Sequence, residues 1–405
     1  MGRNRALPAL VVAGAAVVLV ATTVAVIAQA PGLTPKEQLG KLIFFDENLS
    51  LNENQSCATC HDPLAGWTGS HVAINAHGSV YEGSIPGAFG DRKPPSSAYA
   101  TFAPVFHLER AGNEFLFVGG NFWDGRATGE TLGSPAAEQA KGPFLNPVEQ
   151  ALPDAASLVT KVCNSDYGDL FKQVWGAEVC DPANVATAYD NIGYSVAAFE
   201  GSAESNAFTS KFDLSRRGLA KLTQQEQRGF ALFNGKGGCK ACHPGNGPQA
   251  IFTDFTFDNL GLPKNPENPI YTRDPDFIDP GLGGYLAHRP EYAADYADAN
   301  MGKHKVPTLR NVGKWDLVLG PEVKAFGHNG YFKTLEGIVH FYNTRDVLAV
   351  CPGDYTEAQA LAAHCWPAPE VADNLNTDEL GDLGLSADEE AAIVAFLKKL
   401  YDGYR

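Results

Sequence analysis

Basic residues are scarce in this sequence of 405 residues. It has 31 lysines and arginines against 47 aspartates and glutamates, which gives a formal net charge of −16 at pH 7. Without a basic surface the chain cannot neutralise phosphate groups, so this balance excludes a nucleic-acid-binding protein. Apolar and polar residues also alternate over no run of convincing length, which argues against a fold built mainly of β-strands. With 44% hydrophobic and 19% charged residues, the composition is that of a folded globular protein and excludes a disordered one.

One long apolar run stands near the N-terminus, at 7–28, behind two arginines. A basic start, an apolar stretch and the small residues Ala28 and Ala30 are typical of an export signal. Pro31 would disfavour cleavage after Ala30, and the run is also long enough for a membrane span of about 20 residues. We therefore expect residues 1–30 to be a signal peptide or an N-terminal membrane anchor, with the remaining chain outside the cytoplasm.

The eight cysteines divide into two groups of four. Four of them form two Cys-x-x-Cys-His motifs, at 57–61 and 239–243. The others form two pairs that are close in sequence, Cys163 with Cys180 and Cys351 with Cys365. In an oxidising compartment such pairs are expected to be disulfides that close short loops, although spacing alone does not determine which cysteines join.

A repeat precedes the two Cys-x-x-Cys-His motifs. Residues 34–44 and 223–233 share Thr, Glu, Gln, Gly and Phe in register. In both copies Thr-x-x-Glu is a capping box that predicts the start of a helix, and apolar residues follow at helical spacing. A third capping box at Ser386 predicts an amphipathic C-terminal helix that packs on the second copy. The repeat predicts a mainly α-helical fold with long ordered loops and two homologous domains, at 31–205 and 206–405.

The spacing within each motif is that of c-type haem attachment. Cys57 and Cys60 lie one helical turn apart, so both thiols can reach the vinyl groups of one haem, and His61 is then held under the iron as proximal ligand. A thioredoxin-like dithiol or half of a zinc site would not explain a histidine after both motifs. The sequence thus predicts two covalently bound c-type haems, each in a cytochrome c-like domain. The residues that repeat the arrangement in the second motif are Cys239, Cys242 and His243.

Four further segments, at 121–126, 138–149, 306–311 and 327–330, resemble the bacterial di-haem cytochrome c peroxidase family, which includes the MauG-type enzymes. The resemblance covers essentially all of the chain after the N-terminal segment, and it implies a periplasmic peroxidase. Hydrogen peroxide would react at the N-terminal haem. Electrons would enter at the C-terminal haem from a small cytochrome c, a cupredoxin or oxidisable side chains of a protein substrate.

The resemblance also implies roles for residues near the first haem. Glu149 matches the distal acid, Gln139 and Pro143 match its neighbours in the pocket, and Trp123 matches the tryptophan between the haems. A carboxylate above the iron can take a proton from peroxide and return it to the leaving oxygen. Calcium between the haems, which the family holds, is left open, because Lys93 stands in place of an asparagine ligand and a protonated lysine cannot coordinate Ca²⁺.

The sixth ligands of the two irons determine the branch of the family. His77 lies sixteen residues after His61, the spacing at which the bacterial peroxidases carry a removable ligand. Tyr342 lies fourteen residues after His328, where ordinary members have methionine, and tyrosine there resembles the MauG type. Met301, the only methionine after the initiator, is a competing ligand. His77 indicates a need for reductive activation, whereas Tyr342 indicates reaction with peroxide in the fully ferric state, so the two assignments conflict.

Two other functions stay open beside the peroxidase. A non-catalytic di-haem electron-transfer cytochrome would have both irons six-coordinate and inert to peroxide. A MauG-type enzyme would mature one specific protein partner by oxidising its tryptophans.

His328 is expected to tune the region between the haems rather than to bind iron. The histidines expected to be surface or core residues are His71, His107, His288, His304, His340 and His364.

Overall fold

The structure is a computed structural model that describes residues 1–2, 32–112, 114–247, 249–314 and 324–404. The chain divides into the units Met1–Gly32 and Leu33–Arg405, and the fold presented below is that of the second unit. Nearly all of the predicted signal peptide or anchor falls on residues 3–31, which lie outside the described residues. Within the described ranges, no helix is both long and apolar enough to cross a membrane.

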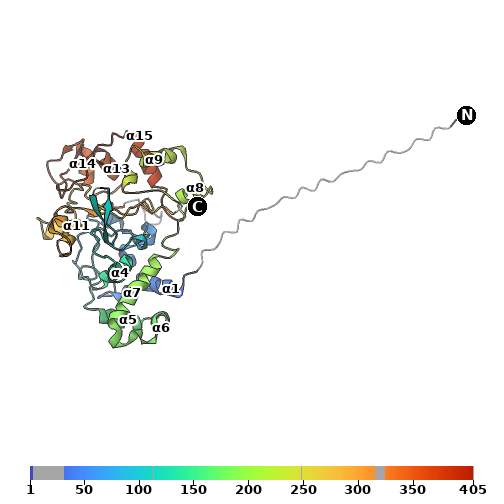
Figure 1. Ribbon diagram of the computed structural model, residues 1–405, viewed down its shortest axis with the longest axis vertical. Coiled ribbons are helices and arrows are strands. Elements are labelled where there is room, and N and C mark those ends of the chain that lie inside the picture. The colour runs from blue at the N-terminus through green and yellow to red at the C-terminus, as the bar shows by residue number, and fades with distance from the viewer. Residues whose placement is uncertain (3–31, 113, 248, 315–323, 405) are drawn as a thin grey trace. The chain divides into compact units, whose positions relative to one another are not determined.

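The first Cys-x-x-Cys-His motif belongs to a group of helices in the first half of the chain (Figure 1). The predicted capping box of Thr34 is present at the start of α1 (Pro35–Phe45), which packs along α7 (Val185–Glu200). The two helices approach closely, because a Cβ added at Gly40 would lie 1.8 Å from the backbone oxygen of Ser195. Apolar side chains of these helices meet in one buried core. The other helices of the group are α2 (Cys57–Cys60), α4 (Pro135–Leu145), α5 (Ala155–Asn164) and α6 (Gly168–Trp175).

The second motif has a helical group of the same construction. Thr223 caps α9 (Gln224–Asn234), which packs along α15 (Ala387–Leu397), so the predicted C-terminal helix and its packing are confirmed. A Cβ added at Gly229 would lie 1.9 Å from the backbone oxygen of Ala392. Gly229 is the in-register equivalent of Gly40, and the repeated glycine therefore serves the same close helix contact in both copies. The other long helices of this group are α8 (Lys211–Arg216) and α13 (Leu335–Thr344).

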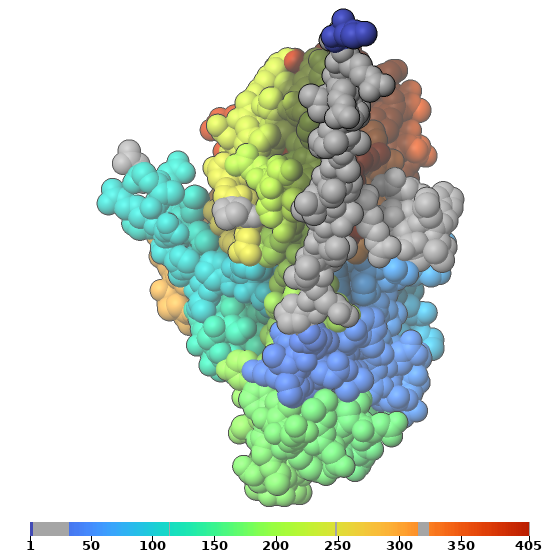
Figure 2. All heavy atoms as spheres, turned by 90° about the vertical axis from the view of Figure 1, so that its right-hand side faces the viewer, coloured from blue at the N-terminus to red at the C-terminus, as the bar shows by residue number. Residues whose placement is uncertain are grey.

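Figure 2 shows both groups from the side: α5 and α6 form one end in green, and the yellow-green segment of α8 and α9 lies toward the other. Loops connect the groups, and they contain short helical segments. These are α3 (Val72–Asn75), α10 (Ile270–Arg273), α11 (Gly281–Leu286), α12 (Ala294–Asp298) and α14 (Glu357–Ala363), with 3-10 turns η1 (Glu47–Leu49), η2 (Pro63–Ala65), η3 (Ala100–Phe102), η4 (Ala177–Cys180), η5 (Pro182–Asn184) and η6 (Cys239–Ala241).

Three two-stranded sheets, which the sequence pattern did not reveal, lie among the described loops. β1 (His107–Ala111) and β2 (Glu114–Val118) pair antiparallel, with His107 opposite Val118. Because four of the five residues of β1 are exposed, its sequence lacks the apolar alternation of a half-buried strand. The other strands have two residues each, too few for any periodicity. They are β3 (Phe257–Asp258) antiparallel to β4 (His304–Lys305), and β5 (Ala349–Val350) parallel to β6 (Cys365–Trp366).

Both predicted disulfides are confirmed. Cys163 of α5 bonds to Cys180 of η4, and Cys351 bonds to Cys365 of β6. The four cysteines of the two motifs take no part in a disulfide. All residues from Leu33 onward belong to one compact unit. The division of this unit into two domains at 205/206 stays a prediction.

Candidate active site

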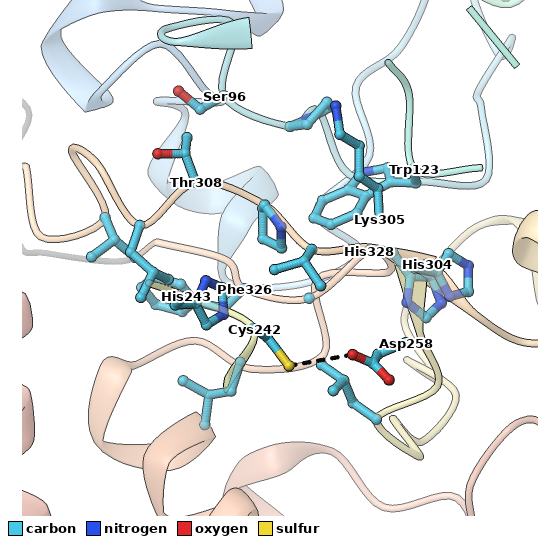
Figure 3. A pocket seen from close by; sticks show the side chains of 18 of the residues that line it. Ser96, Trp123, Cys242, His243, Asp258, His304, Lys305, Thr308, Phe326 and His328 are labelled. Atoms are coloured by element: carbon cyan, nitrogen blue, oxygen red, sulfur yellow. Dashed lines mark hydrogen bonds between the residues drawn. The ribbon is translucent and has the colours of Figure 1, made fainter. Parts of the chain in front are cut away.

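A cavity is lined by residues of both helical groups (Figure 3). His61 of the first motif and His243 of the second both lie on its wall. Trp123 and Tyr342 line it as well, and so do apolar side chains such as Phe233. The fold therefore brings both predicted proximal ligands to one continuous space.

The two histidines have matching environments. Nδ1 of His61 lies 3.3 Å from the carbonyl oxygen of Trp67, and Nδ1 of His243 lies 2.8 Å from that of Phe252. Burial lowers the pKa of both imidazoles to about 4. Both rings are therefore neutral at pH 7, carry their proton on Nδ1 and leave the Nε2 lone pair for a metal.

The thiols complete a donor set that fits a c-type haem in each half. Cys57 and Cys60 stand at the two ends of the single-turn helix α2, and Cys239 opens η6. Burial raises the pKa of Cys57 and of Cys239 to about 12, so these thiols are protonated. Two thiols one turn apart, a neutral imidazole beside them and a largely apolar wall are what covalent haem attachment requires.

The three candidate sixth ligands lie in different places. Tyr342, from α13, is on the cavity wall, and burial raises the pKa of its phenol. Met301 is not among the described residues that line the cavity. His77 is also absent from that lining: 68% of its side chain is exposed, and its Nδ1 lies 2.8 Å from Glu267 Oε1. The structure therefore brings only Tyr342 of these three to the cavity.

The residues matched to the peroxide pocket lie around α4. Gln139, on that helix, and Trp123 line the cavity, whereas Pro143 and Glu149 are not among its described lining residues. Burial raises the pKa of Glu149, and the charge of Arg126 opposes that shift. The carboxylate of Glu149 also acts electrostatically on the Cys60 thiol of the first motif. Glu149 is therefore a half-buried acid close to the first haem-attachment site.

A polar cluster on the wall was not indicated by any sequence pattern. His304 stacks on His328 with ring centroids 3.5 Å apart, and Asp279 and Glu370 line the same cavity. His304 is thus a buried wall residue with a close partner. His304 belongs to the short strand β4 and the other three side chains to separate loops, and no spacing in the sequence relates the four.

Two lysines, the buried Lys93 and the half-buried Lys305, flank Trp123. Nζ of Lys93 donates to Thr68 Oγ1 at 3.0 Å and to the carbonyl oxygen of Pro94 at 2.8 Å, while Nζ of Lys305 bonds to carbonyl and amide oxygens at 120–121. The indole Nε1 of Trp123 donates to the Lys93 carbonyl at 2.8 Å. Burial lowers the pKa of both amines to about 7. Calcium between the haems, against which Lys93 argues, stays open.

Glu200 is another buried acid that the sequence did not indicate. It ends α7, is 3% exposed, and its Oε2 has no hydrogen-bond partner among the described residues. Burial raises its pKa to about 8. Its charge is the next cause after burial that raises the pKa of the Cys57 thiol.

The fold is that of known di-haem peroxidases. The structure superposes on the diheme peroxidase BthA of Burkholderia thailandensis with a TM-score of 0.74 and 30% identity, over 92% of this chain and 87% of that chain. By sequence, the chain is 35% identical to methylamine utilization protein MauG of Paracoccus denitrificans over 90% of this chain and 88% of that protein. It is 28% identical to cytochrome-c peroxidase IdrP2 of Denitromonas iodatirespirans, over 90% and 80% of the two chains. Residues 34–221 match the family model described as di-haem cytochrome c peroxidase.

The chain therefore belongs to the di-haem cytochrome c peroxidase family, whose relatives include MauG. Members of this family are oxidoreductases that carry two c-type haems. The predicted class of enzyme, the mainly helical fold and the two haems are confirmed. The roles of the individual residues on the cavity wall stay predictions.

Proposed function

We propose that this enzyme reduces hydrogen peroxide to water with electrons from a protein donor, using one haem at each Cys-x-x-Cys-His motif. The observation that carries the proposal is the single cavity lined by His61, His243 and Trp123. Each haem, when bound, supplies an iron that can accept and pass single electrons, and the first one binds peroxide. A shared cavity lets both oxidising equivalents of peroxide be handled within one molecule.

The chain's own residues would orient the two haems. The Nδ1 hydrogen bonds of His61 and His243 to backbone carbonyls fix each ring, so that Nε2 can bind iron. The phenol of Tyr342 would be the second protein ligand in the C-terminal half. Since His77 is exposed, pairs with Glu267 and is not among the described residues that line the cavity, the iron held by His61 would keep a position available for peroxide.

Glu149 would carry the proton. Burial favours the protonated carboxyl while the charge of Arg126 and a hydrogen bond from Asn146 favour the carboxylate, so the group can both accept and donate. It would take a proton from one oxygen of peroxide and give it to the other, which breaks the O–O bond and releases water. Two electrons from the donor and two protons from solvent complete the reduction to two water molecules. Gln139 on the wall would hold peroxide through its side-chain amide, and Pro143 would shape the pocket beside it.

The electron donor would be a small cytochrome c or a cupredoxin. The net charge of −16 favours a donor with a basic docking face, because opposite charges speed the encounter. A second candidate is oxidation of side chains in a specific protein partner, as in a MauG-type role. The 35% identity to MauG and the placement of Tyr342 on the cavity wall favour it. Steady peroxide turnover with reduced cytochrome c or cupredoxin alone would favour the first candidate.

We also propose that the enzyme works in the periplasm. Two disulfides within the fold are typical of proteins that mature in an oxidising compartment. Peroxide is also a small diffusible substrate that reaches this compartment from outside. Fractionation of cells followed by detection of covalent haem in each fraction would test the assignment.

Replacing Glu149 by Gln tests the proposed function. The amide has nearly the same shape but cannot accept the proton, so peroxide turnover should fall about 10²–10⁴-fold. Glu109→Gln, on the exposed strand β1, is the matched control and should retain turnover. Both variants should carry two haems, measured by mass and by the haem absorbance of the denatured protein. Turnover at the wild-type rate in Glu149→Gln would refute the acid–base role.

A further inference from the structure

His304 and His328 form a stacked pair beside Trp123 (Figure 3). Their ring planes differ by 4°, their centroids are 3.5 Å apart, and their side chains are 9% and 8% exposed. The His328 ring also meets the indole of Trp123 edge-on, with centroids 6.5 Å apart. Both histidines line the cavity that His61 and His243 line. The pair therefore belongs to the wall that the two haem sites share.

The geometry of the pair calls for one more proton than two neutral imidazoles carry. Nδ1 of His304 lies 3.0 Å from the carbonyl oxygen of Gly302, and its Nε2 lies 3.3 Å from Asp279 Oδ2. Both neighbours are acceptors, and a neutral imidazole has only one N–H, so one ring nitrogen faces an oxygen with no proton between them.

Nε2 of His328 also lies near carboxylates, although farther from them. It lies 3.9 Å from Asp279 Oδ2 and 3.8 Å from Glu370 Oε2. Neither this atom nor Nε2 of His304 has a hydrogen-bond partner among the described residues. Two buried ring nitrogens are thus directed at carboxylates without a hydrogen bond to either, which is costly unless a proton is added.

The charges around the pair leave one negative charge unbalanced. Arg92 pairs with Asp279 and with Asp124, and Arg126 pairs with Asp124. Glu370 accepts a hydrogen bond from the neutral phenol of Tyr271 at 2.6 Å. Asp279 and Glu370 face the pair directly, and Asp279 belongs to an ion-pair network with Arg92, Asp124 and Arg126. Together these five side chains hold three carboxylates and two guanidiniums.

One proton added to the histidine pair would offset the excess negative charge of this network, whereas two added protons would exceed it. Two imidazolium ions with centroids 3.5 Å apart would repel each other strongly in a buried site. The pKa of His304 is lowered to about 4, first by burial and then by the charge of His328, against the pull of Asp279. The close stacking of the rings therefore allows one added proton on the pair and not two.

A metal ion fits the same atoms poorly. An ion bound in the plane of one imidazole would lie out of the plane of the other, because the planes are parallel and 3.5 Å apart. The carboxylate of Asp279 is also already held by Arg92, at 2.6 and 2.7 Å. A proton needs neither a tilt of the rings nor the release of Arg92.

We propose that His304 and His328 share one proton that is taken up when a haem in the cavity is reduced and released when it is oxidised. This inference rests on the proposed function in one respect: it requires a bound haem whose iron changes its charge when it is reduced or oxidised. A ferric haem in the cavity would carry one more positive charge than a ferrous one, so its reduction would leave the carboxylates beside the pair with less positive charge near them. When the donor protein delivers one electron to the iron, one proton from solvent forms an N–H bond at an Nε2 of the pair and restores that positive charge. Oxidation breaks the N–H bond and returns the proton to water.

The pH dependence of the haem reduction potentials in the holoprotein tests the proposal. Uptake of one proton with one electron lowers a potential by about 59 mV per pH unit where the two are coupled. We expect the wild type to approach this slope for at least one haem within about pH 5–9, and His304→Gln with His328→Gln to lose it. His107→Gln, at an exposed histidine of β1, is the matched control and should keep the wild-type slope.

Proton counting provides a second measurement on the same samples. Reduced holoprotein reoxidised with ferricyanide in unbuffered solution should release about one proton per electron in the coupled range, read with a pH indicator dye. Glu370→Gln removes the carboxylate that lacks a cationic partner and should reduce this release while both histidines remain.

Two results would overturn the proposal. The first is an equal slope and equal proton release in the wild type and the double histidine variant. The second is a stoichiometric zinc or copper ion in the holoprotein that the double variant loses, measured by elemental analysis against iron. If the wild-type holoprotein shows the proton coupling but does not turn over peroxide, the proposed function is contradicted, whereas the inference about the histidine pair still stands.

Discussion

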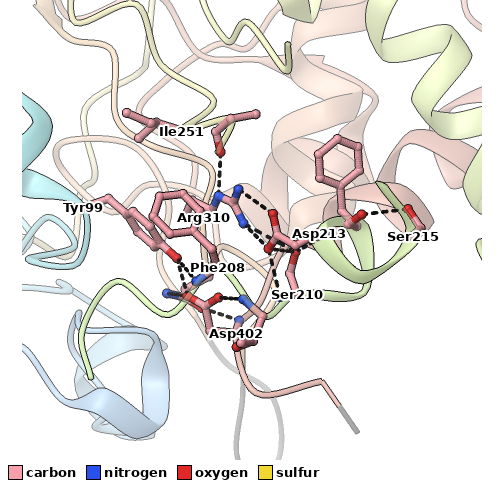
Figure 4. Close-up of polar contacts among 12 residues, drawn as sticks. Tyr99, Phe208, Ser210, Asp213, Ser215, Ile251, Arg310 and Asp402 are labelled. Carbon is pink, nitrogen blue, oxygen red and sulfur yellow. Dashed lines mark hydrogen bonds and ion pairs between the residues drawn. The ribbon is translucent and has the colours of Figure 1, made fainter. Parts of the chain in front are cut away.

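Arg310 is the largest fully buried polar side chain on the cavity wall, and replacing it tests how the fold supports that wall. Its guanidinium donates to Asp213 Oδ2 at 2.5 Å and to Oδ1 at 2.8 Å, and its Nε donates to the carbonyl oxygen of Ala250 at 2.7 Å (Figure 4). The exposed fractions of the two charged side chains are 0% and 3%. Although burial raises the pKa of Asp213, the hydrogen bonds from Arg310 hold it below the ordinary value. Aromatic rings that surround the guanidinium belong to Tyr99, Phe208 and Phe252.

We predict that Arg310→Met lowers the free energy of unfolding by about 3–5 kcal/mol, because it leaves the Asp213 carboxylate buried without its partner. The loss should be largest at neutral pH and smaller in acid, where the abandoned carboxyl is protonated. Denaturant titration of the holoprotein followed by far-ultraviolet circular dichroism measures it. Lys398→Met removes one side of the exposed pair with Glu336 and should change stability by less than about 1 kcal/mol. An equally small change in Arg310→Met would refute the reasoning.

Three further changes test other parts of the structure. Burial raises the pKa of Glu200 from 4.5 to about 8, so the stability that its protonated carboxyl contributes is complete below about pH 4.5 and is lost progressively as the pH rises to about 8. Glu200→Gln should therefore stabilise the protein by roughly 3–5 kcal/mol above pH 8 and leave it unchanged near pH 4; the same effect at both pH values would contradict this. Replacing both Cys163 and Cys180 by serine opens a loop of 17 residues and should cost about 3 kcal/mol in denaturant titration, so an unchanged midpoint would contradict the estimate. Tyr342→Phe should change the ferric absorption spectrum of the holoprotein, and an unchanged spectrum would exclude Tyr342 as a ligand.

The helices beside the two motifs could be predicted because their signals are local. Thr34 and Thr223 each open a capping box three residues before a glutamate, and both boxes are formed. The repeated glycines, Gly40 and Gly229, stood in register in the sequence, and both allow a close helix contact. The loop disulfides also followed from closeness along the chain.

The polar part of the site could not be predicted, because it depends on where loops fold. His304, in the two-residue strand β4, stacks on His328, in a loop, and their carboxylate neighbours come from two further loops. The number of residues between two positions in a loop also does not determine where the loop places its side chains. His77 has the spacing of a ligand but pairs with Glu267 on the surface, whereas Tyr342, on a regular helix, lies on the cavity wall.

The most direct test of the central claim is the optical spectrum of the fully ferric holoprotein after one equivalent of hydrogen peroxide is added. With Tyr342 on the cavity wall and His77 away from it, the account predicts a rapid change in the Soret band. The change should be lost in Glu149→Gln, which keeps both haems. A spectrum that peroxide leaves unchanged in both the ferric and the half-reduced protein would contradict the account and identify a non-catalytic electron carrier.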